Sequence, residues 1–298
     1  MKYEITGETL QFDGRTLHRI KALIAIPGRR VEAGDLGGYV ESYGNLSQEG
    51  AAWIADDAKV FGNAEVCGDA KVCCDAEVSG DALVYGAAMV SGYAKVSGMA
   101  EVFDDAKVYG GAKVCGDAEV SGAAIVYGAA MVCDAAEVSG KARVYGKAHV
   151  YGDAEVSGEA RVYGAARVCD GAAAFGKSRV SGRAMVCCKA RIGGEAVVRA
   201  LKDFIVFKNF WSSGRSFTWT RSDNMYQVGC FRGTGAELVA RAYGDSERSG
   251  REYGRVVEYV EAALIGMAGD SLAPPSRVAE AADSTQEDSA EKEESLTS

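Results

Sequence analysis

Aliphatic residues recur at every sixth position of the chain from Ile54 to Val198. Of these 25 consecutive positions, 22 hold Val, and the exceptions are Ile54, Ala174 and Ile192. A small residue, nearly always Ala, stands four positions after each aliphatic one, and Gly is the commonest residue two positions after it. Polar and charged residues fill most of the positions between. The phase of the repeat does not shift over 144 residues, so this repeat decides the fold.

A period of six is neither the 3.6-residue period of a helix nor a hairpin repeat with a turn and a return strand. Branched and small residues favour a short strand, and Gly permits the tight corner that follows it. Three hexads would make one triangular coil with the Val and Ala side chains directed inwards. Successive coils would stack as parallel strands about 4.8 Å apart and give a prism roughly 40 Å long. The sequence therefore predicts a mainly β protein with a parallel β-helix of about eight 18-residue coils over residues 54–198.

Side chains directly before and after each core position would point outwards, and residues 18 apart would stack on one face. This register sorts the outward side chains onto three faces, which we name after their characteristic residues. The glutamate face carries Glu65, Glu101, Glu119, Glu137 and Glu155 beside Ser121, Ser139 and Ser157. The arginine face carries Lys107, Arg143, Arg161 and Arg179 beside Tyr109, Tyr127, Tyr145 and Tyr163. The cysteine face carries Lys113, Met131, His149, Arg167 and Met185 beside Cys115, Cys133, Tyr151, Cys169 and Cys187.

The repeat Ala-x-Val-x-Gly-x resembles that of the hexapeptide-repeat proteins, whose fold is the LpxA-like left-handed parallel β-helix shared with trimeric acyltransferases. The preceding residues, Ala33-Gly-Asp-Leu-Gly-Gly-Tyr-Val40, Asn45-Leu-Ser-Gln-Glu-Gly50 and Trp53-Ile54, resemble the leading segment of the YdcK-like proteins, which have many phage and prophage relatives. The resemblance covers about residues 1–200. It implies a left-handed coil and a homotrimer. It implies little about activity, because the group carries at best an unproven transferase label.

The segment before the repeat, residues 1–53, is expected to form a β cap over the first open end of the β-helix. Strands are predicted at residues 3–5 and 17–26, with Pro27-Gly28 and Gly37-Gly38 as punctuation between strands.

After the repeat, residues 199–266 predict a small α+β module. Strands are expected at residues 203–208, 215–221 and 225–231, with a turn at 222–224. Thr234-Gly-Ala-Glu237 is a capping box that opens a helix. Helical spacing continues through Tyr253, Val256, Val257, Val260 and Leu264. This module is either a C-terminal cap or a unit that recognises a partner.

The last segment, residues 267–298, is acidic and predicted to be disordered, because it has too few apolar residues to offset the entropy of ordering. It carries a charge of −6 out of the net −9 of the chain. Within the repeat, residues 54–140 carry −9 and residues 141–198 carry +5, so the prism is dipolar. A nucleic-acid-binding body would be clearly basic, and we expect no nucleic acid partner.

Cysteine and histidine usage limits the chemistry of the chain. Nine Cys without a visible signal peptide predict free thiols in a reducing cytoplasm, the host's if the protein is phage-encoded. No run of 18 apolar residues is present, so no membrane span is expected. With only His18 and His149 and no Cys-x-x-Cys pair, a metal site is not expected.

The charged ladders offer the main candidate site. Stacked like charges repel unless salt water or a complementary face of another subunit meets them. Glu101, Glu119, Glu137 and Glu155 form the acidic face that such a subunit would present. The candidate ligand-binding or inter-subunit residues are Arg143, Tyr145, Arg161, Tyr163 and Arg179. Arginines beside tyrosines would also suit an anionic, ring-bearing ligand such as a nucleotide, whereas the tyrosine ladder could equally only stiffen the coil.

Catalysis would depend on His149, the only His in the prism. The resemblance to acyltransferases implies a His general base and an acyl-CoA donor bound between subunits. No residue at a suitable spacing orients His149, however, and the unbroken repeat leaves no loop to cover a substrate. No nucleophile elbow, P-loop or dinucleotide fingerprint is present. We therefore expect a non-enzymatic scaffold or binding protein related to phage or prophage proteins, without catalytic residue, cofactor or metal. The alternatives are an acyltransferase using His149 and a sequestering protein for a nucleotide-like anion.

Overall fold

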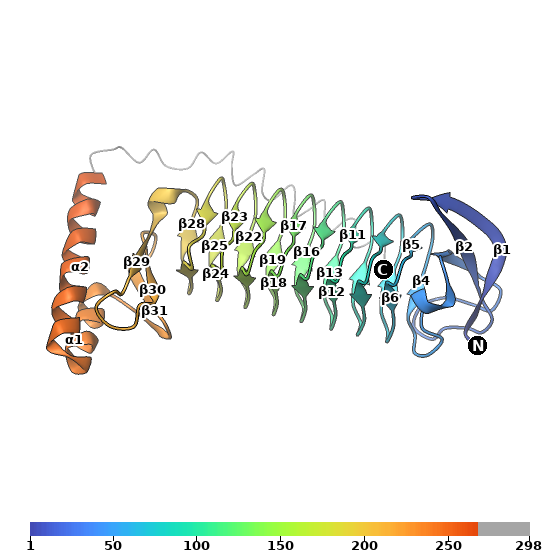
Figure 1. Cartoon of the computed structure of the whole chain (residues 1–298), viewed down its shortest axis with the longest axis horizontal. Coiled ribbons are helices and arrows are strands. Elements are labelled where there is room, and N and C mark those ends of the chain that lie inside the picture. The colour runs from blue at the N-terminus through green and yellow to red at the C-terminus, as the bar shows by residue number, and fades with distance from the viewer. Residues whose placement is uncertain (268–298) are drawn as a thin grey trace.

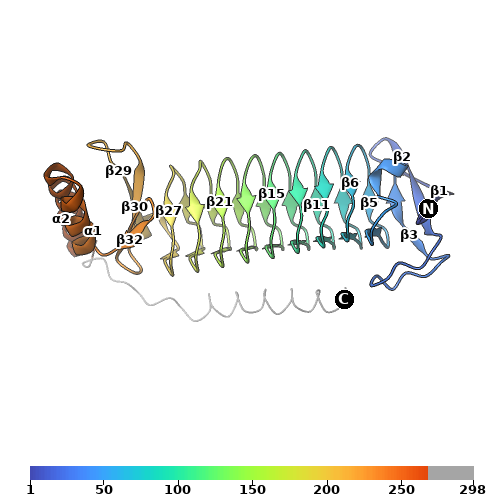
Figure 2. The same ribbon diagram turned by 90° about the horizontal axis from the view of Figure 1, so that it is seen from below.

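The computed structural model describes residues 1–267, except the side chains of residues 265–267, and shows a straight rod (Figure 1). A parallel β-solenoid forms the body of the rod, with an antiparallel β segment at its N-terminal end and an α+β module at its C-terminal end (Figures 1 and 2). The predicted disordered tail lies outside the described residues. No helix among the residues described combines the length and the apolar character needed to cross a bilayer.

Two-residue strands form three parallel sheets, one beneath each face. The glutamate-face sheet contains β6 (Glu65–Val66), β9 (Leu83–Val84), β12 (Glu101–Val102), β15 (Glu119–Val120), β18 (Glu137–Val138), β21 (Glu155–Val156), β24 (Ala173–Ala174) and β27 (Arg191–Ile192). The arginine-face sheet contains β4 (Trp53–Ile54), β7 (Lys71–Val72), β10 (Met89–Val90), β13 (Lys107–Val108), β16 (Ile125–Val126), β19 (Arg143–Val144), β22 (Arg161–Val162), β25 (Arg179–Val180) and β28 (Val197–Val198). The cysteine-face sheet contains β5 (Lys59–Val60), β8 (Glu77–Val78), β11 (Lys95–Val96), β14 (Lys113–Val114), β17 (Met131–Val132), β20 (His149–Val150), β23 (Arg167–Val168) and β26 (Met185–Val186).

The pairing register joins residues that are 18 apart, as the repeat predicts. Glu137 pairs with Glu155, Arg143 with Arg161, and each next coil follows the same rule. The predicted fold class and the composition of the three faces are thereby confirmed. The left-handed sense of the coil stays a prediction from the resemblance.

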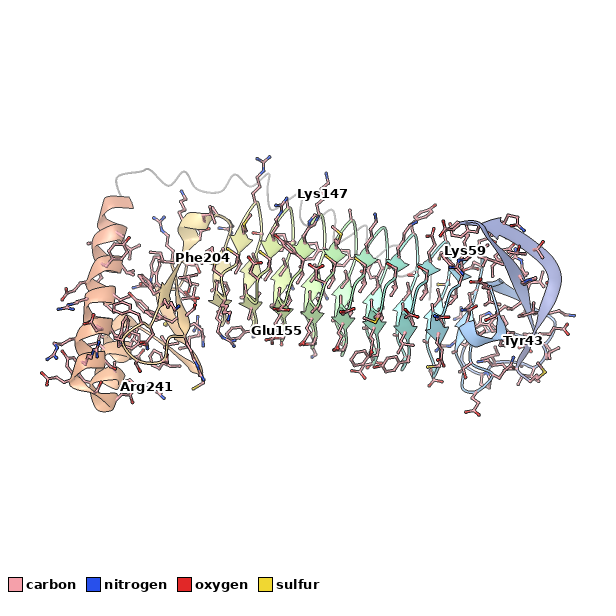
Figure 3. All side chains as sticks on the ribbon, in the orientation of Figure 1. Tyr43, Lys59, Lys147, Glu155, Phe204 and Arg241 are labelled. Carbon is pink, nitrogen blue, oxygen red and sulfur yellow. The ribbon has the colours of Figure 1, made fainter. Side chains whose placement is uncertain are left out.

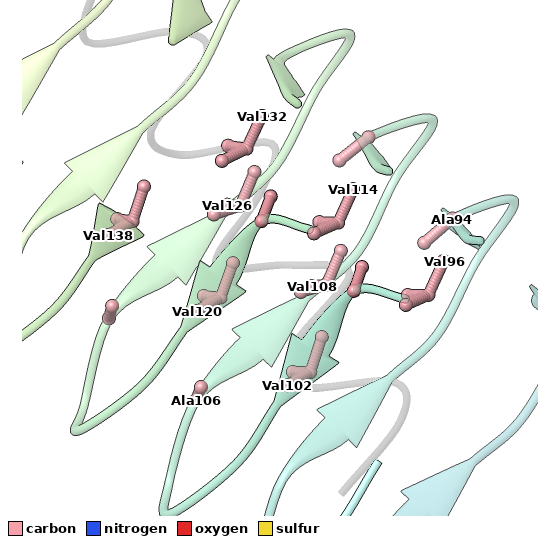
Figure 4. Close-up of a cluster of buried hydrophobic side chains, with 14 of the residues drawn as sticks. Ala94, Val96, Val102, Ala106, Val108, Val114, Val120, Val126, Val132 and Val138 are labelled. Carbon is pink, nitrogen blue, oxygen red and sulfur yellow. The ribbon is translucent and has the colours of Figure 1, made fainter. Parts of the chain in front are cut away.

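The interior of the solenoid is a dry column of Val and Ala side chains (Figure 4). Val120, Val126 and Val132 are 0% exposed, and so are nearly all the Ala residues that separate the Val positions. Each corner requires a left-handed residue. At Gly128, for example, φ is +72° and an added Cβ would lie 3.1 Å from the N atom of Gly146. At Asp104, φ is +57° and the carboxylate accepts a hydrogen bond from the N–H of Gly122 in the next coil.

The N-terminal segment extends the stack by part of a coil. β1 (Tyr3–Phe12) and β2 (Arg15–Ala22) pair antiparallel, and β2 pairs with β3 (Leu36–Val40), which then pairs in parallel with β5. A 3-10 turn, η1 (Tyr43–Asn45), leads to a parallel bridge between Leu46 and Val66. Counted with β3 and the bridge at Leu46, the solenoid has about nine coils rather than about eight.

Two expectations for this segment were wrong. The strand predicted over residues 17–26 ends at Ala22. Gly37 and Gly38 lie inside β3 and not between strands, because the first coil packs too closely for a side chain there. A Cβ on Gly38 would lie 2.5 Å from the carbonyl oxygen of Ala58.

The C-terminal module follows a 3-10 turn, η2 (Leu201–Asp203). Its antiparallel sheet contains β29 (Phe204–Lys208), β30 (Ser216–Thr220), β31 (Met225–Val228) and β32 (Phe231–Gly233), and its helices are α1 (Gly235–Asp245) and α2 (Glu247–Met267). The predicted capping box is present: the N–H of Thr234 donates to Glu237, and the N–H of Glu237 donates to the hydroxyl of Thr234. A second core forms around Phe217, Trp219 and Tyr226.

Most backbone hydrogen bonds between coils have the same direction, from an N–H group of one coil to a carbonyl group of the next coil along the chain. The N–H of Lys59 donates to the carbonyl of Ala76 in the next coil at 2.9 Å, and most corner and strand-flanking residues repeat this direction. The N-terminal end of the stack therefore presents mainly carbonyl groups, and the C-terminal end presents mainly N–H groups. Open edges of this kind must be covered if they are not to pair with other chains.

Each end is covered by side chains of the required polarity. At the N-terminal end, donors bind the free carbonyls: the Lys2 ammonium reaches the oxygen of Ala52 at 2.9 Å, and the Tyr3 hydroxyl reaches that of Leu46 at 2.8 Å. At the C-terminal end, side-chain oxygens accept hydrogen bonds from the free N–H groups. The carboxylate of Asp203, for example, accepts from the N–H of Arg199 at 2.7 Å. The C-terminal module therefore caps the solenoid, whatever else it does.

Candidate functional site

The arginine face carries a shallow groove of about 360 Å³ over three consecutive coils. The residues that line it are Lys141, Arg143, Glu159, Arg161, Lys177 and Arg179. The three arginines come from β19, β22 and β25 and pair in register along the rod. The two lysines and Glu159 come from the corner that precedes each of these strands. Five cations and one carboxylate thus share one open groove, which is a surface suited to a partner of negative charge.

The structure brings together three of the five residues predicted for this site. Arg143, Arg161 and Arg179 line the groove, whereas Tyr145 and Tyr163 do not. The corner residues Lys141 and Lys177 were missed, because only positions next to a core residue were sorted onto faces. The signal was present in the sequence, since these two lysines also stand 36 residues, or two coils, apart.

The four tyrosines of the arginine face stack on one another. Ring centroids of Tyr109, Tyr127, Tyr145 and Tyr163 follow at 5.2, 4.9 and 5.0 Å, with nearly parallel planes. Tyr145 is only 2% exposed. The faces of the inner rings are covered by their neighbours, so they cannot stack on a ligand. The ladder stiffens the rod, with about 0.5–1.5 kcal/mol for each stacked pair beyond the area that it buries.

The glutamate face lies on the other side of the corner that carries Lys141. Glu119, Glu137 and Glu155 are exposed, and Figure 3 shows Glu155 and Lys147 projecting from different sides of the rod. The hydroxyl of Ser157 donates to Glu155 at 2.9 Å. Nearer the N-terminal end, the hydroxyl of Tyr85 donates to Glu101 at 2.9 Å. Burial of Tyr85, together with this carboxylate, raises the pKa of the phenol to about 12.

On the cysteine face, His149 lies between Met131 and Arg167 of the neighbouring coils, as the register predicts. Its imidazole is half-buried and has no hydrogen-bond partner within residues 1–267. A general base needs a group that fixes its tautomer and a place for the substrate. The neighbours of His149 supply a thioether and a guanidinium, and neither can orient an imidazole for catalysis.

The thiols of the cysteine face are poor nucleophiles at neutral pH. Burial is the largest cause that raises the pKa of Cys133 to about 11, and burial likewise raises that of Cys187 to about 11. Since the thiolate is the reactive form and the metal ligand, these groups are largely inert. All nine cysteines are free thiols.

One group of possible metal ligands occurs in the described part of the chain: Asp56, Cys73 and Cys74, whose ligand atoms lie within 4.8 Å of one another. The Asp56 carboxylate already accepts the N–H of Cys74 at 3.0 Å, as the Asp side chains of other corners do for the coil above. Burial raises the pKa of Cys73 to about 12. The group is therefore explained as a corner of the solenoid with a buried thiol.

Comparison of the sequence with protein-family models and with curated proteins found no match. The class of protein is defined by the fold: a parallel β-solenoid with an acidic and a basic face and a C-terminal α+β cap. The likeness to YdcK-like proteins rests on its sequence motifs alone.

Proposed function

We propose that the chain is a non-enzymatic scaffold that works as a parallel homotrimer, with the glutamate face of each copy packed against the arginine face of the next. The observation that carries this proposal is the charge complementarity of the two faces: four of the eight residue pairs that would meet are oppositely charged, and none is like-charged. Contact between two different faces is heterologous, and such contacts close into a ring when the rotation permits. The smallest closed ring of this kind is a trimer with its axis along the rod.

In such a ring, residues of neighbouring copies contact each other when they lie at nearly the same height along the rod axis. Consecutive strands along the chain differ in height by a third of a coil, or about 1.6 Å. The arginine-face residue of the neighbouring copy that lies closest in height to a given glutamate-face residue is therefore the one six positions later in the sequence. For example, Glu137 would meet Arg143, and Glu155 would meet Arg161.

The eight pairs defined by this rule contain no like charges. Four pairs have opposite charges: Glu65 with Lys71, Glu101 with Lys107, Glu137 with Arg143, and Glu155 with Arg161. One pair is apolar, Leu83 with Met89, and the remaining three are Glu119 with Ile125, Ala173 with Arg179, and Arg191 with Val197. Charge complementarity of this kind fixes the register and the partner of an interface more than it adds affinity.

The other combinations of faces match less well. Packing the arginine face on the cysteine face would oppose Lys107 to Lys113 and Arg161 to Arg167. Packing the cysteine face on the glutamate face gives three pairs of opposite charge, all before residue 120, and leaves the arginine ladder without a partner. The pairing of the glutamate and arginine faces uses both ladders.

The resemblance of about residues 1–200 to YdcK-like proteins supports a scaffold of phage or prophage origin that works in the host cytoplasm, where nine free thiols stay reduced. The proposed packing leaves the cysteine face outside the contact. His149 would then face solvent without a second subunit over it, which argues against an acyl donor bound there.

Light scattering at micromolar concentration and physiological salt tests the proposal. We expect the mass of three chains, and a monomer would overturn the trimer. The double variant Arg143→Glu/Arg161→Glu should dissociate, because it opposes Glu to Glu at two heights. Adding Glu137→Arg and Glu155→Arg to the same chain should restore the trimer. Arg179→Glu is the matched control, since its partner is Ala173, and it should stay assembled.

Cysteine cross-linking tests the register. Leu83→Cys and Met89→Cys in one chain should give covalent trimers on mild oxidation. In the variant Leu83→Cys/Lys107→Cys, the two cysteines would differ in height by one further coil, and no covalent trimer should form. If both variants cross-link equally, the contact has no fixed register and the proposal is wrong.

A second candidate function, sequestration of a nucleotide-like anion in the groove, is favoured by Lys177 and Arg179. In the proposed trimer these two cations meet no carboxylate from the ladder of the neighbouring copy. Loss of nucleotide binding in Lys177→Gln/Arg179→Gln, with the trimer intact, would support it.

A further inference from the structure

A second and larger pocket lies where the solenoid ends and the C-terminal module begins. It has a volume of about 780 Å³, and Lys189, Arg191, Lys208 and Arg215 are among the residues that line it. The region is the junction between β27 and β30, at which Figure 2 places the antiparallel sheet against the last coil. We infer that this junction pocket is a binding site for a small polyphosphate anion, distinct from the groove of the arginine face.

The charge of the pocket is the first reason. Four cationic side chains line it, and none of the carboxylates of residues 1–267 does. Lys189 comes from the corner before β27, Arg191 from the first position of β27, Lys208 from the end of β29, and Arg215 from the loop before β30. None of the four forms an ion pair with a carboxylate of residues 1–267. Four like charges around one hollow repel one another unless an anion lies between them.

The location strengthens this repulsion. The C-terminal end of the solenoid presents mainly backbone N–H groups, whose partial charge is positive. Where the module covers this end, it does so with acceptors such as Thr218 and Ser222. β26 remains an edge strand and leads directly into the corner that holds Lys189. Sheet edges with free N–H groups favour anions, so cations gathered here need a negative partner more than they would elsewhere on the rod.

Arg191 is held ready for a ligand. Its guanidinium lies over the ring of Phe175, with 5.0 Å between the guanidinium carbon and the ring centroid. Its backbone N–H is fixed to Thr218. Its Nε is buried and has no hydrogen-bond partner among the described residues. A guanidinium fixed by stacking loses less entropy when it binds an anion, and its planar fork matches the oxygens of a phosphate.

The size and spread of the cations select the class of anion. The volume lies within the range of about 300–1,000 Å³ typical of small-molecule sites. The four cations come from three separate segments around this hollow, so an anion with several charged groups can contact more of them than a single phosphate can. A chain of two or three linked phosphates carries the matching number of charges on a compact frame. Inorganic tripolyphosphate and a nucleoside triphosphate share this chemistry.

Isothermal titration of the full chain at physiological salt tests the inference with three probes: sodium tripolyphosphate, ATP and adenosine. We expect tripolyphosphate and ATP to bind once per chain and adenosine not to bind. Lys208→Gln/Arg215→Gln should weaken both by about tenfold or more, since it removes two of the four positive charges that line the pocket. Both side chains are exposed, so the variant should fold.

The matched control removes one exposed Lys and one exposed Arg that line neither the groove nor the junction pocket, as Lys147→Gln/Arg248→Gln. It should leave the affinity for tripolyphosphate within about twofold. An equal loss in both double variants would overturn the inference, because binding would then follow net charge. Absence of tripolyphosphate binding at millimolar concentration, or binding of adenosine as tight as ATP, would overturn it too. The trimer is tested by mass, so the two proposals fail separately.

Discussion

The backbone N–H of Arg191, in the last strand of the glutamate-face sheet, donates a hydrogen bond of 2.9 Å to the hydroxyl oxygen of Thr218 in β30. A side-chain acceptor thus takes the place of the carbonyl that a further coil would supply. The hydroxyl of Ser222 does the same for Val197, the first residue of the last strand of the arginine-face sheet, at 2.8 Å. The end of the repeat is therefore set by chemistry that matches the polarity of the open edge.

Replacing Thr218 by Val should destabilise the junction, because it keeps the shape of the side chain and removes the acceptor. Thr218 is 0% exposed, so the N–H of Arg191 would be left without water or partner. The expected cost is about 1–3 kcal/mol of unfolding free energy. Thr218→Ser keeps the hydroxyl and should cost less. Chemical denaturation followed by tryptophan fluorescence measures both, and equal losses would show that the methyl group matters more than the hydrogen bond.

Val132→Asp should abolish cooperative folding. Val132 is 0% exposed inside the column of Val and Ala, and a carboxylate there would have no partner and no water. The cost of burying such a group is several kcal/mol, a large part of the stability of a typical domain. Met131→Asp is the control, since the neighbouring side chain points outwards. If Val132→Asp melts like the wild type while Met131→Asp does not, the register is off by one residue.

Most of the solenoid could be predicted from sequence because its core is strictly periodic. Only one register buries every Val from Val60 to Val168, and that register also fixes which side chains share a face. The start of the stack could not be predicted in the same way. β3 has Gly37 and Gly38 where the repeat has larger residues, and only its packing against Ile54 and Ala58 explains them.

The two candidate sites also differ in how far the sequence predicts them. The arginine ladder of the groove follows from spacing alone, since Arg143, Arg161 and Arg179 are 18 residues apart. The junction pocket has no such signature. Lys189, Lys208 and Arg215 meet only because the antiparallel sheet packs on the last coil, and no period in the sequence encodes that packing.

Ser178→Ala should stabilise the protein. Ser178 stands at a position of the repeat that otherwise holds Ala, and it is 0% exposed. Its hydroxyl has no hydrogen-bond partner among the described residues. Removing a buried hydroxyl of this kind should raise the unfolding free energy by about 1 kcal/mol. An unchanged or lower melting temperature would mean that a bound water satisfies the hydroxyl. Ser181→Ala, nearby on the arginine face, serves as the comparison.

Cys73 should resist alkylation at pH 8, whereas the exposed Cys188 and Cys230 should react. Burial raises the pKa of Cys73 to about 12. The thiolate fraction is then on the order of 10⁻⁴ at pH 8, against about a quarter for an ordinary thiol. Because the thiol must lose its proton to react, the rate should rise with pH up to the raised pKa. Iodoacetamide labelling with peptide mass mapping measures the order, and the unfolded chain should label at all nine sites.

His149→Ala should leave every activity of the protein unchanged. The imidazole lies between Met131 and Arg167, and neither neighbour is a carboxylate or carbonyl that would fix its tautomer. The uninterrupted repeat also places no loop over His149 that would exclude water from a thioester. Turnover of acetyl-CoA or longer acyl-CoA against a panel of amine and hydroxyl acceptors is the decisive assay. Turnover that disappears in His149→Ala, in a variant that still has the trimer mass, would establish an acyltransferase. Absence of turnover in both proteins, with equal affinity for tripolyphosphate, is the expected result.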